Sequence, residues 1–116
     1  MPTKEKLNKL ADEYELNSDI FAFAHYESDT VSGVIILKRI KNDEFEIISI
    51  SVSPKFRRQG IASSLISFAL RNLKCAVLKA ETDNDAVGFY RGFGFNIESL
   101  GEKYPGIVRY LCTLEP

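Results

Sequence analysis

Between residues 44 and 73 the spacing of the apolar side chains changes once, and this change limits what the chain can fold into. Residues 44–53, EFEIISISVS, are rich in β-branched side chains with a period of two, which predicts a strand that Pro54 ends. One face of that strand is predicted to carry Glu46, Ile48, Ile50 and Val52. From residue 61 onward apolar residues recur every third or fourth position, which predicts a helix over 60–73.

The turn between these two elements is basic. In SPKFRRQG, residues 53–60, the following stand where the helix begins: Lys55, Arg57, Arg58, Gln59 and Gly60. Unpaired backbone N–H groups and the positive end of the helix dipole meet there, so the arrangement predicts an anion site, with phosphate as the anion. Gly60 lets a ligand approach the backbone closely, and Ala62 keeps the neighbouring position small. A plain basic loop before a helix-starting glycine is an equal alternative on these residues alone.

The other segments also divide into helix and strand patterns. They are an amphipathic helix over 4–15, strands over 20–27 and 32–40 joined by a loop longer than two residues, a buried strand over 75–81, a short helix from an Asn84 N-cap to Gly94, and strands near 94–99 and 107–114. The predicted order is therefore helix, three strands, helix, strand, helix and two strands.

Composition limits the classes of partner. The chain has 116 residues, enough for a single domain spanning 1–116. Its net charge of −1 gives no broad attraction for nucleic acid or for an anionic membrane, so neither is expected as a partner and phosphate recognition must be local. The N-terminus lacks the apolar core of a signal peptide, and no apolar run is long enough to span a membrane. A cytoplasmic location is the expectation.

Two cysteines and one histidine are predicted to have structural roles. Cys75 and Cys112 stand alone in apolar runs, without metal-site or CxxC spacing, and we expect both to be buried, reduced packing residues. His25 alternates with Phe21 and Phe23 on one face of a strand, and no partner for a catalytic base or second metal ligand is evident nearby. No metal site is predicted.

Two stretches resemble the motifs of a known family. Arg57-x-x-Gly60-x-Ala62 matches the Q/R-x-x-G-x-G/A signature of the GNAT superfamily of acyl-CoA-dependent N-acyltransferases, and Val52-Ser53-Pro54 matches the V-x-P that precedes it. NDAVGFYRGFGF, residues 84–95, is similar to the second GNAT motif, N-x-x-A-x-x-F/L-Y-x-x-x-G-F, with one residue of slack after Asn84. The resemblance covers nearly the whole chain. It implies an α/β (α+β) fold of GNAT type, with a mixed, mostly antiparallel central sheet of about six strands flanked by helices.

The resemblance implies that acetyl-CoA is the cosubstrate. Backbone N–H groups of residues 58–63 would hold its pyrophosphate, and the strand over residues 50–52 would run beside the pantetheine arm and polarise the thioester carbonyl. The residues that the resemblance assigns to coenzyme binding are Ile50, Ser51, Val52, Arg57, Arg58, Gln59, Gly60, Ile61, Ala62, Ser63, Asn84 and Phe89.

The resemblance also implies two catalytic residues. Tyr90 matches the motif tyrosine that protonates the departing thiolate. Without that match, the sequence favours an aromatic residue that packs against the neighbouring phenylalanines. Glu46 is the predicted base, because a carboxylate on an apolar strand face has its pKa raised, and its offset from Val52 is that of the glutamate in histone-acetylating members. The alternative is an exposed charge beside Asp43 and Glu44.

These features predict an N-acetyltransferase that acetylates a primary amine of a small molecule or peptide by direct transfer in a ternary complex. A non-catalytic acyl-CoA-binding sensor or regulatory module is the alternative. Fewer residues precede V-x-P than in many GNAT members, so we expect an acceptor pocket that is open or completed by a second subunit in a homodimer. GEKYPGIVRY, residues 101–110, is predicted to form a loop and then a strand; its charges would either select the acceptor or belong to a solvated turn.

Overall fold

The computed structural model describes residues 19–116, and the helix predicted over 4–15 lies outside them. The elements in chain order are β1 (Ile20–Glu27), β2 (Thr30–Lys41), β3 (Glu44–Val52), the 3-10 turn η1 (Pro54–Phe56), α2 (Ile61–Leu73), β4 (Val77–Thr82), α3 (Val87–Phe93), β5 (Asn96–Tyr104) and β6 (Ile107–Leu114).

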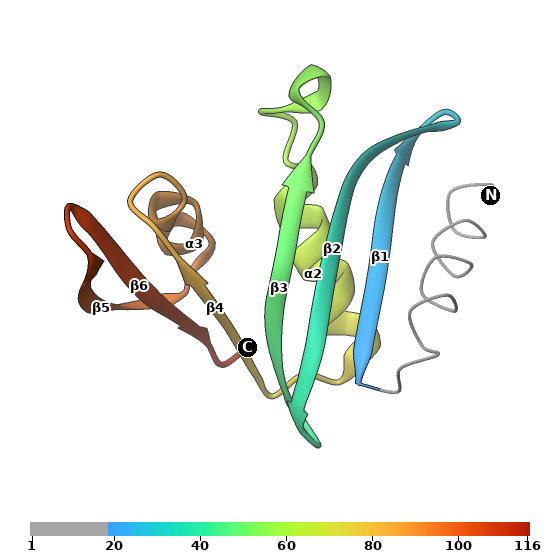
Figure 1. The fold of residues 1–116 in the computed structure, drawn as a ribbon. Helices are drawn as coiled ribbons and strands as arrows, with labels where there is room; N and C mark the ends of the chain where they lie inside the picture. Colours follow the sequence, from blue (N-terminus) through green and yellow to red (C-terminus); the bar gives the residue numbers. More distant parts are fainter. Residues whose placement is uncertain (1–18) are drawn as a thin grey trace.

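One six-stranded sheet organises the described residues (Figure 1). Its strand order is β1-β2-β3-β4-β6-β5, and every neighbouring pair is antiparallel except β3 and β4. That parallel pair follows from the chain order, because α2 carries the chain back to the starting edge of β3 before β4 begins. α2 packs on β1–β3 and α3 packs on β5 and β6. The predicted mixed, mostly antiparallel sheet with flanking helices is confirmed.

The β1–β2 and β5–β6 hairpin loops are shorter than predicted. β2 begins at Thr30, so the first loop is the pair Ser28–Asp29, with Ser28 in the left-handed region at φ 55°. β5 continues through Tyr104, so most of the loop predicted after residue 100 is strand, and the chain reverses at Pro105–Gly106 with φ +79° at Gly106. β5 is an edge strand exposed along nearly its whole length, so it carries no alternation of apolar and polar residues that would reveal it in the sequence.

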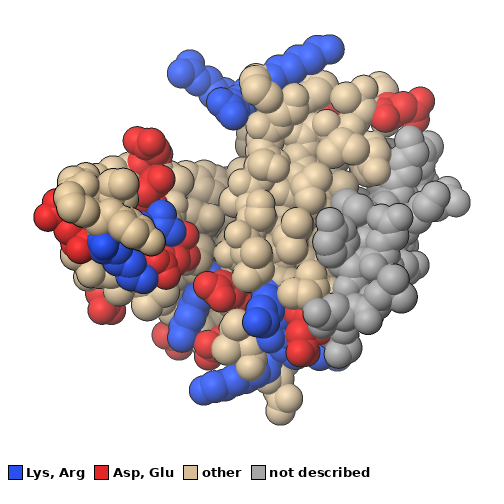
Figure 2. Space-filling model, in the orientation of Figure 1, with Lys and Arg blue, Asp and Glu red and all other residues tan. Residues whose placement is uncertain are grey.

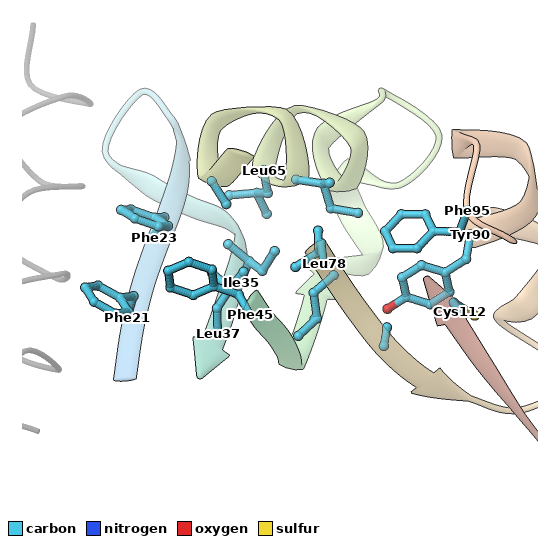
Figure 3. Packing of buried hydrophobic residues seen from close by; sticks show 14 of the residues in the cluster. Phe21, Phe23, Ile35, Leu37, Phe45, Leu65, Leu78, Tyr90, Phe95 and Cys112 are labelled. Atoms are coloured by element: carbon cyan, nitrogen blue, oxygen red, sulfur yellow. The ribbon is translucent and has the colours of Figure 1, made fainter. Parts of the chain in front are cut away.

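The buried apolar residues of the described chain form one core along the face of the sheet that α2 and α3 cover. In Figure 3 it extends from Phe21 and Phe23 across Phe45 and Leu78 to Tyr90, beneath both helices. Phe45 and Leu78 are fully buried and lie opposite each other in the β3–β4 register. Burial of a side chain of this size contributes about 2–3 kcal/mol, so this pair ties the two halves of the sheet together.

Gly33 lets α2 approach the sheet closely. A Cβ atom at this position would lie 2.9 Å from Ile61 Cγ2 and 3.2 Å from Leu65 Cδ1, both on the first turns of α2. It would also lie 3.1 Å from the Ser51 carbonyl oxygen. The absent side chain therefore fixes the position of the N-terminus of α2 over β2.

Neither described helix is long and apolar enough to cross a membrane.

Candidate active site

β3 and β4 pair at their starts and then separate. Residues 44–46 of β3 pair with residues 77–79 of β4, and no later residues of the two strands pair. Figure 1 shows the two strands diverging beyond that point. We call this opening the fork. On its β3 side, the backbone groups of residues 48–52 that face β4 have no strand partner among the described residues. Such groups can form hydrogen bonds with the amide groups of an extended ligand in the fork.

A β-bulge reverses the side-chain alternation of β3 inside the fork. Leu37 pairs with Ile47 and Ile36 pairs with Ser49, so Ile48 is an extra residue. The prediction that Glu46 shares a face with Ile50 and Val52 is therefore wrong. Glu46 faces away from α2, whereas Ile50 and Val52 pack against the core on the α2 side. The period-two pattern of the sequence does not reveal a bulge, although one added residue moves every later side chain to the opposite face of the sheet.

The basic turn ends in a helix start with unpaired N–H groups. Gly60 caps α2 in the left-handed conformation at φ 75°, and Arg58 is also left-handed at φ 64°. The Ser64 N–H donates to the Gly60 carbonyl oxygen at 3.0 Å, so the N–H groups of Ile61, Ala62 and Ser63 precede the first intrahelical hydrogen bond. A Cβ at Gly60 would meet no atom within 4 Å, so open space lies in front of this backbone.

A pocket of about 280 Å³ lies at this helix start. It is lined by Val52, Phe56, Arg57, Arg58, Gly60, Ile61, Ala62, Ser63 and Phe89. Eight of the twelve residues predicted to bind the coenzyme therefore meet around one cavity. Phe56 was missed by the sequence analysis; its only signal was its place inside the basic turn. Gln59 lies beside the pocket in sequence without lining it, and Ile50 and Ser51 lie on β3 just before Val52.

Basic side chains surround the pocket without filling it. Lys55, Arg57 and Arg58 are exposed, and Figure 2 shows Lys and Arg side chains projecting at the top of the molecule, where Figure 1 places the η1 turn. Arg57 Nε donates to the Val52 carbonyl oxygen at 3.4 Å, and Lys55 Nζ lies 5.6 Å from the centre of the Phe56 ring. The positive charge around the pocket thus comes from this turn, whereas the chain as a whole has a net charge of −1.

Tyr90 lies in the core between α3 and the strands. Its ring centre is 5.2 Å from those of both Phe89 and Phe95, in edge-to-face contacts. Figure 3 shows the ring above Cys112 with its hydroxyl directed away from the α3 backbone. Burial raises the pKa of Tyr90 to about 12, with a smaller contribution from the neighbouring Cys112. The phenol is therefore neutral and able to donate a proton at every physiological pH.

Glu46 lies at the base of the fork, on the face of the sheet that neither α2 nor α3 covers. It is half-buried and is the last β3 residue that pairs with β4. Its cross-strand neighbours are Lys38 on β2 and Lys79 on β4, and Lys79 Nζ forms an ion pair with Glu44 at 3.1 Å. The apolar surroundings predicted for this carboxylate are wrong, because the bulge turns the apolar residues to the other face.

The two cysteines and the histidine lie apart from the pocket at the start of α2. Cys112 is buried under Tyr90, whereas Cys75 is only half-buried just before β4, and both thiols are free. His25 Nδ1 lies 2.7 Å from Ser32 Oγ, and the same hydroxyl donates to the His25 carbonyl oxygen at 2.9 Å. Within residues 19–116, no three potential metal ligands of the His, Cys, Asp or Glu type come together.

Comparison with known proteins identifies the family. Residues 2–95 match the Acetyltransferase (GNAT) family. The chain belongs to the GNAT family. An uncharacterized N-acetyltransferase encoded in the lysA 3′ region of Bacillus methanolicus is 36% identical over 76 residues. That alignment covers 63% of this chain and 62% of the relative, so less than two thirds of the relative is spanned.

Solved structures share the GNAT fold. A protein from Desulfovibrio desulfuricans assigned to the GNAT family superposes with a TM-score of 0.78 at 20% identity, covering 92% of this chain and 77% of that one. A protein from Bacillus anthracis assigned as a streptothricin acetyltransferase, solved with acetyl coenzyme A, gives a TM-score of 0.79 at 25% identity, covering 92% and 69%. Both superpositions include most of the described sheet and helices.

The structure also corrects the alignment of the second GNAT motif. Asn84 is not the N-cap of α3: it is exposed, lines a different cavity and accepts a hydrogen bond from Tyr110 Oη at 2.6 Å. Asp83 Oδ1 instead accepts from the N–H groups of Asp85 at 3.0 Å and Ala86 at 3.2 Å. With Asp83 in the first position, the GNAT motif spacing to Ala86 needs no slack. Asp83 thus holds the turn before α3, whose N-cap is Ala86 without a side-chain cap.

Proposed function

We propose that this chain is an N-acetyltransferase that moves an acetyl group from acetyl-CoA to a primary amine by direct transfer. The observation that carries the proposal is the shared cavity at the α2 start, which joins the free N–H groups of residues 61–63 to the open edge of β3 and to Phe89. Family membership and the acetyl coenzyme A complex of the Bacillus anthracis protein support it.

The residues present fit coenzyme A. The N–H groups of Ile61, Ala62 and Ser63 and the helix dipole suit a diphosphate, and the left-handed Gly60 leaves space for it against the backbone. Arg57 and Arg58 are placed to add charge-assisted contacts at the rim. The β4-facing edge of β3 suits the two amides of a pantetheine arm. When bound, the thioester supplies an activated acetyl carbon.

Two protons must move during transfer. The amine nitrogen forms a bond to the acetyl carbon as the carbon–sulfur bond breaks, the ammonium group loses a proton, and the leaving thiolate gains one. We assign the donated proton to Tyr90, whose buried phenol has a pKa of about 12 and remains protonated. We assign proton acceptance to Glu46, which lies at the base of the fork on the face opposite the helices.

Release of free thiol tests the activity. Acetyl-CoA is incubated with a panel of primary amines, and at least one should release thiol faster than the amine-free reaction. Tyr90→Phe should lower kcat by about 100-fold, the usual size of a general-acid contribution, while CoA affinity by calorimetry stays within a few-fold. Glu46→Gln should also lower kcat, because an amide cannot accept the proton of the amine.

The outcomes separate the alternatives. If folded protein gives no binding heat with acetyl-CoA or CoA, the proposed function is wrong. If acetyl-CoA binds but no amine releases thiol, the chain is an acyl-CoA-binding module rather than an enzyme.

A further inference from the structure

Three charged side chains form a cluster on the face of the sheet that no described helix covers. Lys103 Nζ lies 3.1 Å from Glu81 Oε1, and Arg109 Nε lies 3.3 Å from the same oxygen. We call these three residues the Glu81 cluster. They come from three adjacent strands, β4, β5 and β6, so the sheet register holds them together. About a third of the Glu81 and Arg109 side chains and half of the Lys103 side chain are exposed.

The cluster lies on the same face of the sheet as Glu46, the residue to which proton acceptance from the amine is assigned. Leu78 and Ala80 are buried toward the helices, so Glu81 and Lys79 point to the opposite face, where Glu46 also lies. Glu81 is two residues beyond Lys79, about 7 Å further along β4 into the fork. The coenzyme pocket at the α2 start includes Phe89 of α3 and no residue of this cluster. An acceptor at the cluster and a coenzyme in the pocket would therefore reach the fork from different sides.

The cluster carries one more positive than negative charge. Lys103 and Arg109 donate hydrogen bonds to Glu81 and hold the pKa of that carboxyl below its usual range, so it is ionised at neutral pH. Glu81 Oε1 accepts both hydrogen bonds, from Lys103 Nζ and from Arg109 Nε. Arg109 uses only Nε in this contact, so its two terminal nitrogens are available to bind a ligand. Two terminal guanidinium nitrogens are the group that binds a carboxylate in a bidentate pair.

Glu98 is an acidic residue on the same face, on the far side of β6 from Glu81. Glu98 on β5 and Glu81 on β4 both lie opposite Leu111 of β6, so they are about 10 Å apart across the sheet. Glu98 forms no ion pair with Arg109 or Lys103. It serves as a control position, because its removal changes the charge of this face without touching the Glu81 cluster.

We propose that the acceptor is an amine that also carries a carboxylate, and that Arg109 and Lys103 bind this carboxylate while the amine points into the fork. The proposal rests on the acetyltransferase function proposed above. Glu81 is then a positioning residue: it orients the two cations and offsets one of their charges. The acceptor class is that of free amino acids and related amino carboxylates, rather than simple alkylamines.

Matched acceptor pairs test this proposal. Each pair is an amino acid and its carboxamide, including α-, β- and γ-amino acids, and thiol release from acetyl-CoA is measured for both. The carboxylate form should have a kcat/KM at least 10-fold higher for one chain length. Arg109→Gln should lower kcat/KM for that acceptor by about 10- to 100-fold, mainly through KM, and change it for the carboxamide by less than about threefold.

Binding without turnover provides the second readout. Calorimetry of the preferred amino acid into protein saturated with CoA should give a Kd that Arg109→Gln weakens and Glu98→Gln does not. Arg109→Lys should restore part of the affinity by keeping the charge. Equal use of acid and carboxamide, or equal binding by the wild type and Arg109→Gln, would overturn the proposal while leaving the transferase intact. Failure to bind CoA would instead reject the proposed function itself.

Discussion

Tyr90 is the residue whose titration the structure constrains most. Burial raises its pKa to about 12, above the value of about 10 for an unfolded tyrosine. Tyrosinate absorbance should therefore show one ionisation step near pH 12 in the folded protein, and Tyr90→Phe should remove that step. Tyr104→Phe, which removes an exposed phenol at the tip of the β5–β6 hairpin, should leave it in place.

The same shift has a consequence for stability. A folded-state pKa above the unfolded value stabilises the fold below pH 10, and this contribution is lost as pH rises from about 10 through 12. Its size is of the order of 2 kcal/mol. The free energy of unfolding of the wild type should fall more steeply across that interval than that of Tyr90→Phe. Parallel curves for the two proteins would show that the phenol is not desolvated in the folded state.

Gly60 and Gly106 allow backbone strain to be separated from ligand binding. Both have positive φ, 75° and 79°, and a Cβ at either would meet no atom within 4 Å. Replacement by alanine should cost each protein about 1 kcal/mol of unfolding free energy from the left-handed conformation. Only Gly60→Ala should also weaken CoA binding, by 10-fold or more in calorimetry, because its methyl group enters the space before the free N–H groups. Equal CoA affinities in the two variants would contradict the anion site.

At the scale of elements, the sequence predicts what depends on local pattern. The strand–turn–helix unit around Gly60 and the helix ending at Gly94 follow from spacing and left-handed positions, and the structure agrees within a few residues. The bulge at Ile48 could not be predicted, because it exists only in the pairing between β2 and β3. The length of β5 was missed for a related reason, since an exposed edge strand needs no apolar alternation.

The predicted site residues show the same difference between local features and features that depend on strand pairing. The place of Gly60 at a helix start was predicted from the sequence, because it depends on local spacing. The surroundings of Glu46 were not, because they depend on which residues face it across two neighbouring strands. Asp83 was passed over for Asn84, although the motif spacing favours Asp83, because asparagine is the residue that the motif prints.

Packing of α2 on the sheet gives a prediction at the element scale. Gly33→Ala should lower the free energy of unfolding by about 1–3 kcal/mol, because the new methyl group overlaps Ile61 and Leu65. It should also weaken CoA binding, since those residues form the start of α2. Gly92→Ala is the matched control: this glycine lies inside α3 with free space around it, and alanine there should stabilise by roughly 0.5–1 kcal/mol. A neutral Gly33→Ala would show that α2 can shift without cost.

At the scale of the whole molecule, the described residues form two halves that meet at the base of the fork. α2 packs on β1–β3, and α3 packs on β5 and β6, so each half has its own helix. Within residues 19–116, the sheet joins the halves only through the three register pairs of β3 and β4. The coenzyme pocket is lined from both halves, by Val52 and the α2 start on one side and by Phe89 on the other. A ligand in that pocket therefore bridges the halves beyond the point where the strands separate.

This bridging predicts how CoA changes the dynamics and stability of the protein. At a free CoA concentration 100 times Kd, the free energy of unfolding should rise by about 2.7 kcal/mol, and amide exchange should slow in α2 and in α3 together. Phe89→Ala should confine the slowing to the α2 half, because Phe89 is the α3 residue that lines the pocket. Phe93→Ala, in the same helix but packed on Phe95 outside the pocket, should keep the slowing in both halves. Slowed exchange in the α2 half alone of the wild type would show that the coenzyme does not span the fork.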